Sequence, residues 1–393
     1  MQFVKTADLL PGMRLAKPIY NKMGVLLYER DTKLTMQGIN SIENFGLIGI
    51  FILEPAEPLP PLSKEDIEFE QFQTIYMFKL KDNMDLLQKG KTPGSMLDLV
   101  VSIQTRYGVL DHKVNFAQTL RSSVDFVYKR SISVAILTAM VSNRLHFGPQ
   151  ERIALITAAL LYSYGYLHIS QKILDKGDEL DQGDMDLIQL NLERGYEEIQ
   201  PAFSDTKLPS LALEIIQQVV FANSERQKVK EPTAKLRQLT DVLKVCDQFD
   251  RMTAMSINKP PVSEIAAIYY LRSHKTEFKP KVVGALSEAI HILPTGACVD
   301  LSDGEKALVL VENPADFLHP MVLKFSNNVI YDLSDPAIAQ NLYVKDIMKT
   351  MDNRISIDET TLEQFTGDKY IHDMTARFRK RKMEIAARHT SKV

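Results

Sequence analysis

The feature that most constrains this chain is an almost wholly apolar run from Ile153 to Leu161. A helix that is apolar on every side has no face suited to water, so the run predicts a helix buried in the centre of an all-helical domain. Gly165 follows the run, and glycine is a common helix stop. We therefore expect the helix to end near Gly165 and to present Tyr162, Ser163 and Tyr166 at its end, where a site can be built.

Composition is typical of a globular protein. The chain has 393 residues, of which 45% are apolar and 25% charged, and this length suffices for about two or three domains. A net charge of −3 excludes a polycation that binds nucleic acid along its whole length. Cys246 and Cys298 lack CxxC spacing and indicate structural thiols in a reducing compartment. With no bilayer-spanning apolar segment and no signal-peptide pattern, we expect a cytoplasmic protein.

The first part of the chain predicts a small module and a linker. Alternating apolar and polar residues between turn signals predict a β-rich N-terminal module over residues 1–55, with one short helix. The next region, 56–113, begins with a proline-rich segment. We expect this segment to be a linker, because proline removes backbone donors and favours extended geometry. Connecting helices over 63–90 and 95–107 follow the linker. They are expected either to pack against the main domain or to form a dimer contact.

In the rest of the chain, the spacing of apolar residues changes once, from a helical period to the alternation of strands. Apolar residues recur at helical spacing over 114–293, which predicts an all-helical core domain. One of its helices is expected to end near Gly195. Alternating runs then predict a small antiparallel β unit over 294–345. The fold class is therefore mainly α, with a small N-terminal α+β module and a small C-terminal antiparallel β unit.

The last region, 346–393, predicts a helical basic tail whose densest part is 377–382. A charge run of this kind is most often a solvated face. The sharper hypothesis is a weak contact with an acidic surface, which includes nucleic acid, a membrane or an acidic partner.

Several short segments occur in the order typical of one family. The stretch 246–253 resembles the motif Ala-Asp-x-Phe-Asp-Ala-Leu-Thr of the HD-GYP cyclic di-GMP phosphodiesterases. The similarity covers about 115–325, and the start of the chain is similar to a module that often precedes HD-GYP domains. HDOD domains, which have an HD-like helical core without metal ligands, are the alternative fold, and the predicted β unit favours HD-GYP. The other segments that carry the resemblance are 173–176, 277–283, 301–305 and the pairs 313–314 and 319–320.

The resemblance implies a site at which most metal ligands are replaced. HD-GYP enzymes use a cluster of Fe, Mn or other divalent ions, which histidine and aspartate side chains hold, to activate water. In this chain Arg130 stands at the first ligand histidine, and Phe126 stands at an acidic ligand one turn earlier. The His-Asp pair falls on Tyr162 and Ser163, and the lysine that follows it falls on Tyr166.

Later ligand positions follow the same trend. Asn191 stands at the next histidine, and only Asp247 is kept. A His-His-Glu run is missing near 219–223, and 224–231 replaces the loop that carries the Gly-Tyr-Pro triplet. We therefore predict no catalytic residue, no metal site and no cofactor.

Two hypotheses remain for the residues at this site. Arg130 either replaces the charge of the metal and pairs with Asp247, or it binds a phosphate while Tyr162 and Tyr166 stack a base. Asp247 is expected to accept a hydrogen bond from Tyr162 or Arg130. His168 is expected to form a hydrogen-bonded pair with Asp247 across the same pocket.

Three functions follow from these alternatives. The first is a catalytically inactive HD-GYP-like protein that regulates or scaffolds bacterial signalling through protein contacts, with partners that the sequence does not identify and an expected homodimer. The second is a sensor that binds cyclic di-GMP or another nucleotide without cleaving it. The third is a phosphodiesterase that uses non-standard metal ligands.

Overall fold

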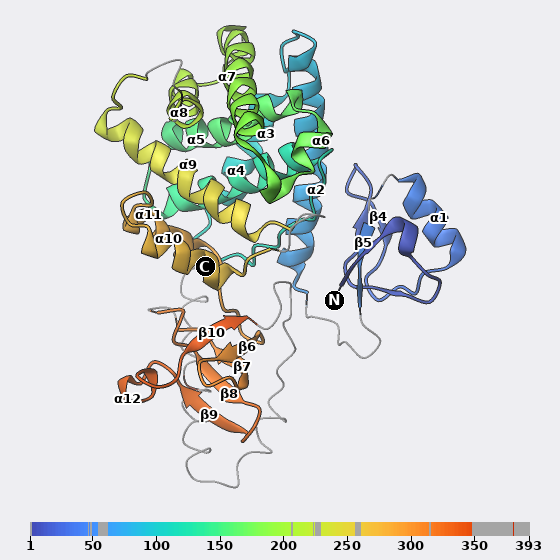
Figure 1. Cartoon of the computed structure of the whole chain (residues 1–393), viewed down its shortest axis with the longest axis vertical. Helices are drawn as coiled ribbons and strands as arrows, with labels where there is room; N and C mark the ends of the chain where they lie inside the picture. Colours follow the sequence, from blue (N-terminus) through green and yellow to red (C-terminus); the bar gives the residue numbers. More distant parts are fainter. Residues whose placement is uncertain are drawn as a thin grey trace.

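The computed structural model has three parts: an N-terminal module, a helical body and a C-terminal sheet (Figure 1). The linker 54–61 and the tail beyond residue 347, including all of 377–382 except the exposed Lys380, lie outside the described residues. The structure describes residues 2–45, 47, 49–53, 62–205, 207–222, 224, 229–255, 261–313, 316–347 and 380.

The N-terminal module packs one helix against short strands. Its main sheet is antiparallel with the order β1-β5-β2, and Gln2 lies opposite Ile52. A separate hairpin pairs β3 with β4, and Leu15 and Ile42 are fully buried in the small core of the module. The predicted α+β module is confirmed. Its elements are β1 (Gln2–Lys5), β2 (Arg14–Leu15), β3 (Ile19–Tyr20), β4 (Leu26–Tyr28), α1 (Met36–Asn44) and β5 (Gly49–Leu53).

The helical body is built around α4. Almost every residue of α4 between Val127 and Ser142 is buried, and the helix contacts α2, α3, α5, α9 and α11. None of the described helices is both long enough and apolar enough to cross a bilayer. The helices of the body are α2 (Lys64–Gln88), α3 (Met96–Tyr107), α4 (Phe126–Arg144), α5 (Pro149–Leu161), α6 (Gln171–Leu174), α7 (Gln182–Asp205), α8 (Ser210–Val220), α9 (Ala234–Thr253), α10 (Glu264–Ser273) and α11 (Pro280–Ala289).

The apolar run of the sequence forms the buried helix that we expected. Every residue of α5 from Ala154 to Leu161 is buried, and α5 packs along α4 (Figure 1). The two connecting helices α2 and α3 contribute Leu80 and Ile103 to the same hydrophobic core. The expected packing of these helices against the main domain is therefore present, and the dimer contact stays a prediction.

Two glycines let the end of α5 approach α7. The helix ends at Leu161, and the next residues form the 3-10 helix η2 (Tyr164–His168), so Gly165 lies inside a turn and is not the helix stop. A Cβ on Gly165 would overlap the carbonyl oxygen of Asn191 on α7. A Cβ on Gly195 would lie 2.5 Å from the Cα of Gly165. The expected end of a helix near Gly195 is therefore wrong, because this glycine is a contact point inside α7.

The C-terminal sheet is a five-stranded antiparallel unit with the order β10-β6-β7-β8-β9. Gly304 has a φ of 83° in the turn between β6 and β7, a conformation that favours glycine. The small antiparallel β unit predicted from the sequence is confirmed, although the five regional boundaries stay predictions. The elements are β6 (Cys298–Leu301), β7 (Lys306–Val311), β8 (Met321–Lys324), β9 (Val329–Asp332), α12 (Pro336–Ala339) and β10 (Val344–Ile347).

Replacing Gly165 with alanine tests the close approach of η2 and α7. We expect G165A to lower the free energy of unfolding by about 2 kcal/mol, because the added methyl group overlaps backbone atoms that cannot rotate away. Urea denaturation measures the change. The matched control is G284A in α11, where a Cβ meets nothing within 4 Å and alanine should stabilise the helix by up to about 1 kcal/mol. Equal stability of G165A and the unmodified protein would contradict the packing described here.

Candidate functional site

A buried ion pair joins α4 to α9 at the position of the expected site. The carboxylate of Asp247 accepts hydrogen bonds at Oδ1 from Arg130 Nε at 2.9 Å and from Arg130 Nη2 at 2.6 Å. The hydroxyl of Tyr162, at the end of α5, donates to the same oxygen at 2.5 Å. The side chain of Arg130 is 9% exposed and that of Asp247 is 17% exposed. Arg130, Tyr162 and Asp247 therefore form one hydrogen-bonded cluster, in which Asp247 accepts from both predicted donors.

The electrostatics of this cluster keep Arg130 charged and Tyr162 protonated. Burial opposes the charge of Arg130, but Asp247 and the neighbouring tyrosines outweigh burial, and the pKa of Arg130 is raised well above its usual value. Burial raises the pKa of Tyr162 far above its usual range. The tyrosine hydroxyl therefore stays protonated at neutral pH and donates to Asp247, while Arg130 stays positively charged.

Aromatic rings surround the guanidinium of Arg130. Its centre lies 5.4 Å from the ring centroids of both Tyr162 and Tyr166, which is within the range of a cation–π contact. Phe126, one turn before Arg130, packs edge-on against Tyr166 with centroids 5.4 Å apart. These contacts bring three of the replaced ligand positions together with Tyr166, which stands at the lysine position.

Two further site positions have their polar groups satisfied locally. The hydroxyl of Ser163 is fully buried and lies 2.8 Å from the hydroxyl of Ser131 on α4. The side-chain amide of Asn191 donates to the carbonyl of Leu187 in its own helix at 2.8 Å. Ser163, at the aspartate of the His-Asp pair, and Asn191, at the next histidine, thus act in packing and in local hydrogen bonds.

The predicted pair of His168 with Asp247 is wrong. His168 Nε2 lies 2.8 Å from a carboxylate oxygen of Glu198 on α7, and its ring packs edge-on against Tyr164 at 5.6 Å. The 3-10 geometry of η2 causes this difference, because the turn carries His168 toward α7, whereas Tyr162 points toward α9.

Sequence reasoning missed a second buried ion pair one turn farther along α9. Arg121 donates from Nη1 and Nη2 to the two oxygens of Asp250, with both distances 2.6 Å. Gln118 donates to Asp250 and to Thr253. The side chains of Arg121 and Asp250 are 6% and 0% exposed. Arg121 lies in an irregular segment before α4, so no periodicity in the sequence marked it.

These residues do not fit a divalent metal cluster. Among the residues that the structure describes, no group of three or more His, Cys, Asp or Glu could hold a metal ion. The carboxylate that remains already accepts three hydrogen bonds at one oxygen, two of them from a cation. A metal ion at this position would repel Arg130 and would find hydroxyl and amide groups where the family provides imidazole and carboxylate.

Curated proteins of two bacteria resemble the chain in sequence. A cyclic di-GMP phosphodiesterase of Pseudomonas aeruginosa is 24% identical over 212 residues, which are 52% of this chain and 49% of the relative. A 3′3′-cGAMP-specific phosphodiesterase of Vibrio cholerae is 26% identical over 184 residues, which are 46% of this chain and 38% of the relative. Both similarities support the resemblance to the HD-GYP family that the sequence motifs indicate. The chain spans about half, or less than half, of the length of these curated relatives.

Comparisons with protein-family models and with solved structures do not extend the HD-GYP resemblance. No protein-family model matches the chain. A solved HDG"Y"P protein of Bdellovibrio bacteriovorus is 12% identical, with a TM-score of 0.41 over 72% of this chain and 97% of that protein. A likeness of this degree is too distant to extend what the curated relatives indicate.

Removing Asp247 tests whether the buried pair is structural. We expect D247N to lower the free energy of unfolding by about 3 kcal/mol, because the charge of Arg130 would stay buried without a carboxylate. Replacing both partners, as R130M with D247L, should restore most of that loss, since no uncompensated charge remains. Urea denaturation of D247N, of the single variants R130M and D247L, and of the double variant measures this coupling.

The control for that cycle is E231Q, which removes the exposed partner of Arg237 at the start of α9. An ion pair that water surrounds contributes less than about 1 kcal/mol, so this variant should be nearly neutral. If D247N were as mild as E231Q, the ion pair between α4 and α9 would not be the structural element described here.

Proposed function

We propose that this chain is a catalytically inactive HD-GYP protein that acts as a regulator or scaffold through protein contacts in cyclic di-GMP-related signalling. The observation that carries the proposal is the contact of Arg130 with Asp247, at 2.6 Å, where the family places a metal ligand. A fixed cation there neutralises the carboxylate that remains and excludes a second positive charge from the same space.

Recruitment of a metal ion to this site would be costly. The ion would have to lose bound water, displace Arg130 from Asp247 and leave that arginine buried without a partner. In return it would gain one carboxylate, together with the oxygens of neutral side chains such as Tyr162 and Ser163. This balance supports a protein that keeps the HD-GYP fold without the hydrolytic chemistry of its relatives.

Exposed aromatic side chains support a role in protein contacts. Tyr269 on α10 is 41% exposed and Tyr343, beside β10, is 45% exposed. The two tyrosines are close enough to interact electrostatically, and α10 contacts β10. Aromatic residues are enriched where proteins bind one another, because they combine a large apolar area with a polar group. A homodimer stays a prediction.

A nucleotide sensor is the second candidate, and one observation favours it. Arg130 lies between the rings of Tyr162 and Tyr166, an arrangement that combines a phosphate-binding cation with stacking surfaces. The burial of Arg130 and its contact with Asp247 favour the first proposal, because a phosphate would meet a carboxylate at the same place.

Metal content and hydrolysis test the proposed loss of activity. We expect protein purified from cells grown with iron and manganese to contain far less than one Fe, Mn or Zn per chain and to leave cyclic di-GMP uncleaved. The matched control is the Pseudomonas aeruginosa phosphodiesterase, prepared and assayed in the same way. Stoichiometric metal together with hydrolysis would overturn the proposal and establish the third function, an enzyme with non-standard ligands.

Calorimetric titration with cyclic di-GMP separates the two remaining candidates. We expect no heat of binding at high micromolar nucleotide, because Asp247 neutralises Arg130. Saturable heat that disappears in the variant R130M with D247L would instead establish a sensor, since that variant keeps the packing and loses the cation.

A further inference from the structure

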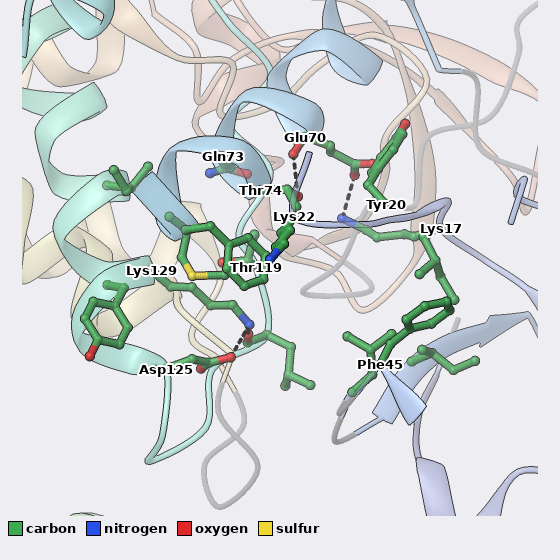
Figure 2. Close-up of a pocket in the computed structure, with 18 of the residues that line it drawn as sticks. Lys17, Tyr20, Lys22, Phe45, Glu70, Gln73, Thr74, Thr119, Asp125 and Lys129 are labelled. Carbon is green, nitrogen blue, oxygen red and sulfur yellow. Dashed lines mark hydrogen bonds and ion pairs between the residues drawn. The ribbon is translucent and has the colours of Figure 1, made fainter. Parts of the chain in front are cut away.

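A large cavity lies between the N-terminal module and the helical body. Its volume is about 790 Å³, a size that accommodates a small organic ligand. Figure 2 shows Lys22 and Phe45 on the side of the module, and Gln73, Thr74 and Lys129 on the side of α2 and α4. Arg130 is not among its lining residues, so the cavity is separate from the replaced metal site.

The walls of the cavity are mainly apolar. The module contributes Phe51 and Ile50, and the helical body contributes Met77, Phe78 and Leu120. Apolar walls favour a ligand with an apolar body, because binding removes both surfaces from water.

Large apolar side chains at the cavity are also left in water. Met23 is 71% exposed, Val124 is 64% exposed and Phe45 is 49% exposed, and all three belong to the lining. They come from the β3–β4 hairpin, from the segment before α4 and from the end of α1. Exposed apolar side chains from three separate elements around one cavity indicate a surface that a ligand covers.

The charged groups of the cavity carry a positive excess. Its lining contains Lys17, Lys22, Lys81 and Lys129 but only the carboxylates of Glu70 and Asp125.

Local ion pairs account for part of this charge. Lys17 pairs with Glu70 at 3.0 Å, and Lys129 pairs with Asp125 at 2.6 Å. Lys81 pairs at 2.7 Å with Asp85, which lies on the same helix outside the lining. Lys22 is exposed, and within the described part of the chain it has no carboxylate partner. The cavity therefore offers one uncompensated cation at an apolar site, which favours an anionic group on the ligand.

The hairpin that carries Lys22 is held against the helical body. Gly24 has a φ of 76°, and a Cβ at this position would lie 2.8 Å from the Cγ1 of Ile75 on α2. This close approach fixes Lys22 beside α2. The neighbouring Tyr20 has a pKa that burial and Glu70 raise to about 12, so its hydroxyl stays a hydrogen-bond donor at neutral pH.

We propose that this cavity binds an amphipathic anion, a molecule with a flexible apolar chain and one carboxylate, whose charged group lies beside Lys22. The apolar chain would occupy the space between Phe51 and Met77. Because the two walls belong to the module and to the helical body, binding favours conformations in which these parts are held together. The inference goes beyond the proposed function and does not depend on it, because the replaced metal site is not involved.

A cyclic dinucleotide fits this cavity less well. Phosphate groups are recognised best by the planar fork of arginine, and among the described lining residues there is no arginine. The walls also contain more apolar groups than two polar bases and two phosphates would use.

Calorimetric titration of the full chain with sodium dodecanoate, below its micelle concentration, tests the proposal. We expect saturable binding of one molecule per chain, and much weaker binding of dodecyltrimethylammonium, which has the same chain and the opposite charge. K22E should lower the affinity for dodecanoate by about tenfold, because an attractive charge becomes a repulsive one at a partly exposed site. The control K207E makes the same charge change at an exposed lysine outside the cavity and should leave the affinity unchanged.

A second variant tests the apolar part of the cavity. T74F places a ring in the cavity from an α2 position that lines it and should abolish binding of dodecanoate while the circular dichroism of the helices is unchanged. Absence of binding to the unmodified chain, equal affinity for both surfactants, or equal loss of affinity in K22E and K207E would overturn the proposal. Competition by micromolar cyclic di-GMP would also overturn it, because the site would then be a nucleotide site.

Discussion

The ion pair of Arg130 with Asp247 determines how the centre of the helical body is built. A buried charge requires a partner of the opposite sign, because water no longer stabilises it. Arg130 on α4 carries the positive charge, and the carboxylate of Asp247 on α9 is its partner. The hydroxyl of Tyr162, at the end of α5, donates a hydrogen bond to the same carboxylate oxygen. Three helices that are distant in the sequence are thereby joined at one point, where family relatives would use a metal ion.

A second buried ion pair lies one helical turn farther along α9. Asp250 follows Asp247 on α9, and Arg121 neutralises it through two hydrogen bonds of 2.6 Å. Both carboxylates on this part of α9 therefore face guanidinium groups from the α4 side of the body. Arginine suits this role because its planar fork binds two carboxylate oxygens and keeps its charge when buried. Guanidinium groups thus neutralise both carboxylates on this part of α9.

The sequence revealed the parts of the fold that depend on local pattern. The apolar run predicted the buried helix α5, and the helical spacing of apolar residues predicted the helical body. Both predictions hold because the burial of apolar side chains determines how these residues are spaced along the sequence. The contact of Arg130 with Asp247 was predictable only through the family resemblance, which placed both residues at one site. Arg121 with Asp250, and His168 with Glu198, were not predictable, because such pairs depend on helix positions in space. The cavity escaped prediction for the same reason, since its walls come from separate parts of the chain.

A crystal structure grown with excess manganese would test most directly whether Arg130 occupies the metal position. The account predicts that an anomalous difference map measured at the manganese edge has no peak within bonding distance of Asp247, and that the guanidinium of Arg130 stays in contact with that carboxylate. An anomalous peak bound to Asp247 and Asn191, with Arg130 displaced from the site, would contradict the account.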